Sequence, residues 1–162
     1  MGNVQVRSFQ REDVPQLLEL MRGLATFEGY LDKFAVSEQD LVDHGLGASP
    51  RFTALVAELD GYDGLAGMAV MYEIPWTYDL RPTVVMKELF VREDARDCRV
   101  GAALLREVAA HAAHRHSPRV IWTVLQDNDS AQRFYARHGG RADAEWQSWM
   151  LDEDAIARLA QS

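Results

Sequence analysis

The chain has 162 residues, of which 48% are hydrophobic, and its formal net charge at pH 7 is -8. This length and composition predict a single domain over residues 1–162 with a hydrophobic core. The acidic balance argues against nucleic acid as a partner, and the single cysteine, Cys98, excludes an internal disulfide framework. Because no apolar run suits a signal peptide or a membrane span, we expect a cytoplasmic protein without membrane contact.

The first half of the sequence predicts a strand, two helices and a hairpin. Asp13 is the expected N-cap of the first helix, with Pro15 in its first turn. Ser37 and Asp40 resemble a capping box that opens the second helix. In chain order the expected elements are a strand over 4–8, a helix carrying Leu17, Leu18, Met21 and Leu24, a turn region over 27–34, a short helix after Ser37 ended by Gly45 and Gly47, and antiparallel strands over 52–58 and 65–73.

The stretch 84–113 predicts a buried strand, a charged loop and a helix that begins near Gly101. The first turn of a helix carries unpaired backbone N–H groups and partial positive charge, so this arrangement is suited to holding an anion. Four arginines surround that point: Arg92, Arg96, Arg99 and Arg106. A phosphate or pyrophosphate site is one interpretation. The alternative is a solvated arginine surface balanced by Glu93, Asp94 and Asp97.

The remaining sequence predicts a further strand over 120–125, parallel to the central one because a helix connects the two. Ser130 is the expected N-cap of a short helix that Gly139 ends. A closing strand over 146–151 and a helix over 152–160 follow. Strands and helices in this order predict a mixed α/β layer fold.

The sequence resembles the GCN5-related N-acetyltransferase (GNAT) superfamily, and within it the diamine group of spermidine/spermine and thialysine N-acetyltransferases. The resemblance covers nearly the whole chain. It rests on Phe27-Glu28, the stretch 36–58, KELFV at 87–91, NDSAQRFYARHGG at 128–140, and Trp146. It implies a GNAT fold, an α/β fold whose mixed central β-sheet has a splayed parallel strand pair flanked by helices.

The resemblance also implies acetyl-CoA as donor, a primary amine as acceptor and a homodimer. Backbone groups of three strand residues would bind pantetheine, the loop from Arg96 to Ala102 would wrap the pyrophosphate, and Asn128 would contact the cofactor. Tyr135 would be the general acid that protonates the departing CoA thiolate; its alternative role is an ordinary packing aromatic beside Phe134. The implied cofactor-binding residues are Leu89, Phe90, Val91, Arg96, Asp97, Cys98, Arg99, Val100, Gly101, Ala102 and Asn128.

Acetyl transfer to an amine also needs a group that accepts a proton. An alkylammonium with a pKa of about 10.4 is free amine in only roughly one molecule in 2,500 at pH 7. Glu88, acting through water, is the candidate base, and a surface pair of Lys87 and Glu88 is the alternative.

Carboxylates and aromatic faces suit a cationic acceptor such as a polyamine, a diamine or a lysine-like amino acid. The expected acceptor residues are Glu28, Glu88, Glu145, Trp146, Trp76 and Tyr78. Three histidines, His111, His114 and His116, lie at a helix end without acidic or cysteine partners nearby in sequence, so we expect no metal.

Two departures from the family pattern affect these expectations. The pyrophosphate loop of the family has glycine where this chain has Arg99, which either crowds the anion or pairs with it. Lys87 occupies the position of the acidic residue proposed as base in the diamine enzymes. The alternatives are therefore an acetyltransferase for a drug-like amine, an aminoglycoside or a protein N-terminus, and a non-catalytic acyl-CoA-binding or regulatory module.

Overall fold

The computed structural model describes residues 2–161. Residue contacts divide the chain into two compact units, one ending at Thr123 and the other beginning at Val124. The single domain over residues 1–162 therefore stays a prediction. None of the described helices is long and apolar enough to cross a membrane.

The first unit contains a mixed sheet, as the sequence predicts, and this sheet has five strands. The strands follow one another across the sheet in chain order, and all neighbours are antiparallel except the last pair, β4 and β5. This parallel pair is joined through a helix, which confirms the predicted crossover connection. The strands are β1 (Val4–Ser8), β2 (Thr53–Leu59), β3 (Leu65–Pro75), β4 (Pro82–Val91) and β5 (Val120–Ile121).

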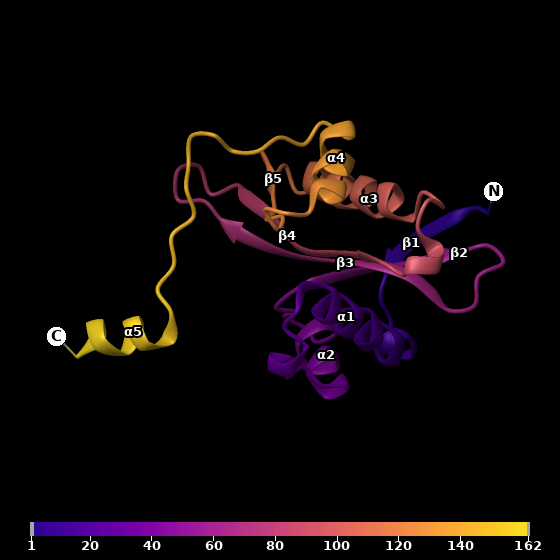
Figure 1. Cartoon of the computed structure of the whole chain (residues 1–162), viewed down its shortest axis with the longest axis horizontal. Coiled ribbons are helices and arrows are strands. Elements are labelled where there is room, and N and C mark those ends of the chain that lie inside the picture. Colours follow the sequence, from indigo (N-terminus) through magenta and orange to yellow (C-terminus); the bar gives the residue numbers. More distant parts are fainter. Residues whose placement is uncertain (1, 162) are drawn as a thin grey trace. The chain divides into compact units, whose positions relative to one another are not determined.

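Helices cover both faces of this sheet (Figure 1). On one face lie α1 (Val14–Glu28) and α2 (Glu38–Gly45), and on the other lies α3 (Val100–His114). Gly23 of α1 lets that helix approach Phe90 closely, since a Cβ at Gly23 would lie 2.9 Å from the Phe90 ring. Successive side chains of each strand point to opposite faces of the sheet, so they face α1 and α3 in turn. Short 3₁₀ helices span Arg11–Asp13, Leu31–Lys33 and Glu93–Ala95.

The predicted helix caps are mostly confirmed. Ser37 and Asp40 form the capping box at the start of α2. Asp13 is the N-cap residue of α1, but its carboxylate does not cap that helix. The predicted turn region over 27–34 begins too early: α1 continues to Glu28, because the left-handed backbone at Gly29 (φ 79°) ends the helix there.

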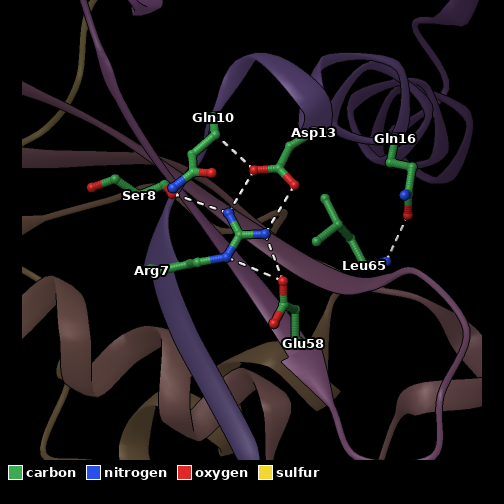
Figure 2. Close-up of polar contacts among 7 residues, drawn as sticks. All are labelled: Arg7, Ser8, Gln10, Asp13, Gln16, Glu58 and Leu65. Atoms are coloured by element: carbon green, nitrogen blue, oxygen red, sulfur yellow. Dashed lines mark hydrogen bonds and ion pairs between the residues drawn. The ribbon is translucent and has the colours of Figure 1, made fainter.

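The Asp13 carboxylate instead binds the Arg7 side chain of β1 (Figure 2). Both guanidinium Nη atoms of Arg7 donate to Asp13, at 2.6 and 3.0 Å, and Arg7 Nε donates to Glu58 Oε1 of β2 at 3.1 Å. The backbone N–H of Gln10 donates to Asp13 Oδ2 at 2.7 Å. This cluster joins two strands to the start of α1.

The last strand of the sheet is shorter than the predicted strand over 120–125. Only Val120 and Ile121 pair with β4, opposite Val84 and Val85. A strand is defined by backbone pairing with a neighbour, and the pairing with β4 stops at Ile121. In the part of the chain that the structure describes, β4 thus continues from Met86 to Val91 without a parallel neighbour, which is the opening expected of a splayed strand pair.

The second unit contains α4 (Asp129–Arg137) and α5 (Glu153–Ala160). The N-cap of α4 is Asn128, whose side-chain oxygen accepts from Ala131 N at 3.1 Å, so the prediction of Ser130 is wrong. The predicted strand over 146–151 is also wrong. This segment forms no strand with any described residue, and its side chains Trp146, Trp149 and Met150 are exposed.

Candidate functional site

A bulge interrupts the pairing of β3 and β4 near the middle of β4. Val70 lies opposite Glu88, whereas the next residue, Met71, lies opposite Met86. Lys87 is therefore the extra residue of β4, which has no partner in the ladder. Such bulges redirect side chains, and this one falls where β4 loses its parallel neighbour.

The Glu88 side chain is partly buried, and one of its oxygens is buried without a partner. Its Oε2 atom is buried without a hydrogen-bond partner among the described residues. Burial raises the pKa of Glu88 above its usual value, Lys87 lowers it, and Glu28 raises it further. The surface ion pair of Lys87 and Glu88 is not formed, since no described carboxylate lies within ion-pairing distance of Lys87. A carboxyl group whose pKa moves upward in this way becomes a stronger base.

The residues around Glu88 include two tyrosines that the sequence analysis missed. Tyr30 follows the end of α1, and Tyr72 lies on β3. Burial raises the pKa of both hydroxyl groups, and the charge of Glu88 raises each further. Tyr72 and Val70 point to the same face of β3, which is the face of Glu88. The alternation of side chains along β3 could have indicated that Tyr72 shares a face with Val70. The bulge in β4, which the sequence does not reveal, hides that Glu88 lies on this face too.

The two aromatic residues that the sequence did indicate, Trp76 and Tyr78, lie in the loop between β3 and β4. The Arg119 guanidinium lies 3.8 Å from the centre of the Trp76 ring, so a cation of the protein itself already occupies that ring face. The Tyr78 side chain is 86% exposed. Glu28 differs from both, because its charge acts on Tyr30 and Glu88.

The arginines of the charged loop have different surroundings. Arg92 stabilises the fold: its Nε donates to Leu65 O at 3.0 Å, and its Nη2 pairs with Glu19. Arg96 lies over the Phe27 ring of α1, 5.9 Å from its centre. Arg99 is exposed and is the N-cap residue of α3. Among the described residues, Arg96 and Arg99 form no ion pair with a carboxylate, and their role in anion binding stays a prediction.

The backbone of this loop is left-handed at two residues that are not glycine. Asp97 has φ 65° and Arg99 has φ 64°. Residues with a side chain rarely adopt this conformation, which glycine adopts readily. The position where the family carries glycine thus keeps a glycine-like backbone in this chain. A left-handed backbone at Arg99 carries a conformational cost that glycine would not have.

The edge of β4 from Met86 to Val91 carries the predicted pantetheine contacts. Leu89, Phe90 and Val91 pair with β3 on one side, opposite Ala69, Met68 and Gly67. Alternate backbone groups of a strand point to opposite neighbours, so the other side presents N–H and C=O groups to an added strand or a ligand.

Four further residues that the sequence indicated belong to the second unit. Asn128 caps α4, and Tyr135 lies on α4 with its ring 5.2 Å from that of Phe134. Glu145 and Trp146 lie in the irregular segment before α5, and both are exposed. The roles of these four residues stay predictions.

The histidines at the end of α3 do not form a metal site. His111 Nε2 lies 2.8 Å from Glu73 Oε1, and Arg115 Nε donates to the same carboxylate at 3.0 Å. Within residues 2–161, no three histidine, cysteine or acidic side chains are grouped to hold a metal ion. The cluster joins β3 to the end of α3.

Comparison with known proteins identifies a matching family model. Residues 15–140 match the model of the acetyltransferase (GNAT) family. A thialysine N-epsilon-acetyltransferase of Sus scrofa is 28% identical over 169 residues, covering 99% of each chain. A spermidine/spermine N(1)-acetyltransferase-like protein 1 of Homo sapiens is 24% identical over 158 residues, which are 93% of this chain and 22% of that protein.

A similar structure has also been solved. An integron cassette protein from the mobile metagenome of V. cholerae superimposes with a TM-score of 0.78, at 24% identity, over 98% of each chain. This similarity confirms the fold that the sequence predicts, a mixed sheet with a parallel strand pair flanked by helices.

Proposed function

We propose a reaction for this chain from the premise that it belongs to the acetyltransferase (GNAT) family. The chain is an enzyme of the N-acetyltransferase class. Its acceptor would be a primary amine of a small cationic molecule: a polyamine, a diamine or a lysine-like amino acid. The observation that carries this proposal is the buried carboxylate of Glu88 with its unpaired oxygen, beside the negative charge of Glu28.

Acetyl-CoA, the co-substrate of the family, would bind along the open edge of β4 and at the start of α3. Backbone groups of Leu89 to Val91 would bind pantetheine in the manner of an added strand. The pyrophosphate would contact the loop from Arg96 to Ala102, where the arginines and the helix N-terminus both favour negative charge. Asn128 would contact the cofactor from the second unit. No step of this binding requires a metal ion.

The chemical step would be direct attack of the free amine on the thioester carbon. Glu88 would accept the proton of the ammonium group, directly or through water, and its raised pKa makes it a stronger base than an exposed glutamate. A new C–N bond would form as the C–S bond breaks. Tyr135 would give its proton to the CoA thiolate, since a tyrosine is a suitable acid for an alkyl thiolate. The attacking nitrogen would lose its second proton as the amide forms, and this proton would return through water to the Tyr135 phenolate.

The remaining acceptor contacts are proposals of different strength. Glu28 is supported by its charge effect on Glu88. Glu145 and Trp146 stay predictions, as do Trp76 and Tyr78, although Arg119 already covers one face of Trp76. The homodimer and the cytoplasmic location, which were expected from the sequence, also stay predictions.

The test is release of free CoA thiol from acetyl-CoA in the presence of single amines. The panel is thialysine, lysine, 1,4-diaminobutane, spermidine, an aminoglycoside and a peptide with a free N-terminus. We expect turnover with at least one of the first four, and a kcat about 100-fold lower for Tyr135→Phe. Tyr62→Phe, whose hydroxyl donates to Asp94 at 2.7 Å, is the matched control with unchanged kcat.

Each part of the proposal has an outcome that would contradict it. Turnover confined to the aminoglycoside or the peptide would overturn the acceptor class. Acetyl-CoA binding without transfer to any amine would support the non-catalytic module instead. An unchanged kcat for Tyr135→Phe across the pH range would remove Tyr135 as general acid.

A further inference from the structure

The Oε2 atom of Glu88 is a hydrogen-bond acceptor that the fold leaves unused. It is buried, and no described residue donates to it. Burying a carboxylate oxygen without a donor is unfavourable, and natural proteins usually avoid it. An N–H donor of a ligand that bonds to this atom would therefore contribute more binding free energy than the same donor bonded to a carboxylate that is already paired.

The strand register places Tyr72 on the same face of the sheet as Glu88. Glu88 lies opposite Val70, and Tyr72 is two residues further along the same strand, so both side chains point to one face of the sheet. That face is covered by α1, because Phe90, two residues from Glu88, packs against Gly23. The bulge at Lys87 keeps Glu88 on this face while β4 continues.

Tyr30 follows the helix that covers this face. Gly29 ends α1, and the Tyr30 backbone N–H donates back to Ala25 O at 2.9 Å, which fixes Tyr30 directly after the helix. Its side chain is partly buried, and the charges of Glu88 and Glu28 raise the pKa of its hydroxyl group beyond the effect of burial. Tyr30 and Tyr72 are thus the described tyrosines whose pKa depends on the charge of Glu88.

We propose that Tyr30 and Tyr72 bind the ammonium group of the acceptor together with Oε2 of Glu88, and that these three oxygens select a primary amine. This inference rests on the proposed function. A primary alkylammonium has three N–H donors, and the site supplies three oxygen acceptors. Tyr30 and Tyr72 are specificity-determining residues in this account, in addition to the acceptor residues that the sequence suggested.

The selectivity follows from the number of N–H donors. A trimethylated ammonium keeps its positive charge and its attraction to aromatic faces, but it has no N–H to donate. Binding by charge alone would treat the primary and the trimethylated amine alike. Binding through the three oxygens would prefer the primary amine, because the other would leave Oε2 and the hydroxyl groups unpaired.

The experiment is calorimetric titration of the CoA-saturated full chain with n-butylamine and, separately, with butyltrimethylammonium. The variants are Tyr30→Phe, Tyr72→Phe and the control Tyr62→Phe, which removes a hydroxyl that donates to Asp94. We expect the parent protein to bind n-butylamine at least tenfold more tightly than the trimethylated cation. Each of the first two variants should lose about tenfold in affinity for n-butylamine only, the size of effect of one hydrogen bond to a charged group.

The outcomes separate this inference from the function on which it rests. Equal affinity of the parent for the two cations, or an equal loss for both in the variants, would overturn the inference. So would variants that keep the parent's affinity for n-butylamine while the parent acetylates an amine, which would leave the proposed function intact. A parent protein that acetylates no amine in the panel would instead overturn the proposed function. Unchanged melting temperatures of the variants establish that lost affinity is not lost folding.

Discussion

Two carboxyl groups of the first unit, Asp13 and Glu88, have opposite environments. Asp13, 7% exposed, accepts both Nη atoms of Arg7 and a backbone N–H, and the hydrogen bond from Arg7 is the main cause of its lowered pKa. Glu88 has an unpaired buried oxygen and a pKa raised chiefly by burial. The first arrangement stabilises the fold. The second is unfavourable without a ligand, which is the property expected of a reactive site.

The backbone shows the same contrast. Near Arg7 the strands β1 and β2 pair in continuous register, although β2 has its own bulge against β3 between Ala57 and Glu58. Between Glu88 and the start of α3 the chain has a bulge at Lys87 and left-handed backbone at Asp97 and Arg99. Such local costs persist where the surrounding structure fixes them, and they gather at functional sites. The four predictions below test this difference.

The largest expected effect comes from Glu88→Gln. Loss of the proposed base should lower kcat/KM about 100-fold to 1,000-fold. The melting temperature at pH 7 should stay equal or rise, because a buried charge is removed. Steady-state kinetics and thermal unfolding of the same preparation measure both. A variant that loses stability and keeps its kcat/KM would make Glu88 a structural residue.

Asp13→Asn should have the opposite signature. It removes a carboxylate from the partly buried guanidinium of Arg7, which keeps Glu58 and some solvent contact, so we expect a loss of about 2 kcal/mol in the free energy of unfolding. The kcat of the folded fraction should not change. Denaturant unfolding against the exposed control Asp63→Asn measures the loss, and a change below that of the control would contradict the structural role.

Arg99→Gly tests the backbone cost directly. Glycine accepts the left-handed conformation of Arg99, so stability should rise by about 1 kcal/mol. Arg106→Gly, in the interior of α3, is the control and should lose about the same amount. If both variants lose stability, the left-handed backbone at residue 99 carries no measurable cost.

The smallest expected effect is on the dependence of stability on pH. The lowered pKa of Asp13 gives stability that is present above about pH 4 and is lost as the pH falls through the folded pKa. The raised pKa of Glu88 gives stability that is present below about pH 4 and is lost as the pH rises through its folded pKa. Free energies of unfolding from pH 3 to pH 7 should therefore flatten at the acid end in Asp13→Asn and decline less toward neutral pH in Glu88→Gln. Identical curves for both variants would contradict the assignment.

The sequence predicted the fold well where local patterns decide it. The alternation of β1, the capping box at Ser37 and the parallel connection of β4 to β5 are all confirmed. The two wrong strand predictions depend on distant partners. A strand over 146–151 needs a neighbour that no local pattern reveals, and the predicted strand over 120–125 ends at Ile121 because its pairing with β4 stops there.

The site was predictable to a smaller extent. Glu88 and the arginine loop were visible as residue types after a buried strand. Tyr30 and Tyr72 were not, because their proximity to Glu88 arises from the bulge at Lys87 and the end of α1 at Gly29. The sequence showed that the family has glycine at the position of Arg99, but it did not show that Arg99 itself has a left-handed backbone. Arg99 has a left-handed backbone, the conformation that glycine adopts readily.

The most direct test of the central claim, that the strained region from Glu88 to α3 is a working acetyl-CoA site, is calorimetric titration with acetyl-CoA. The parent protein and Arg99→Gly are compared under the same conditions, with desulfo-CoA as a second ligand. We predict binding of one cofactor per chain by both proteins. Failure of both proteins to bind acetyl-CoA or desulfo-CoA would contradict the account, and binding by Arg99→Gly alone would mean that Arg99 closes the cofactor loop.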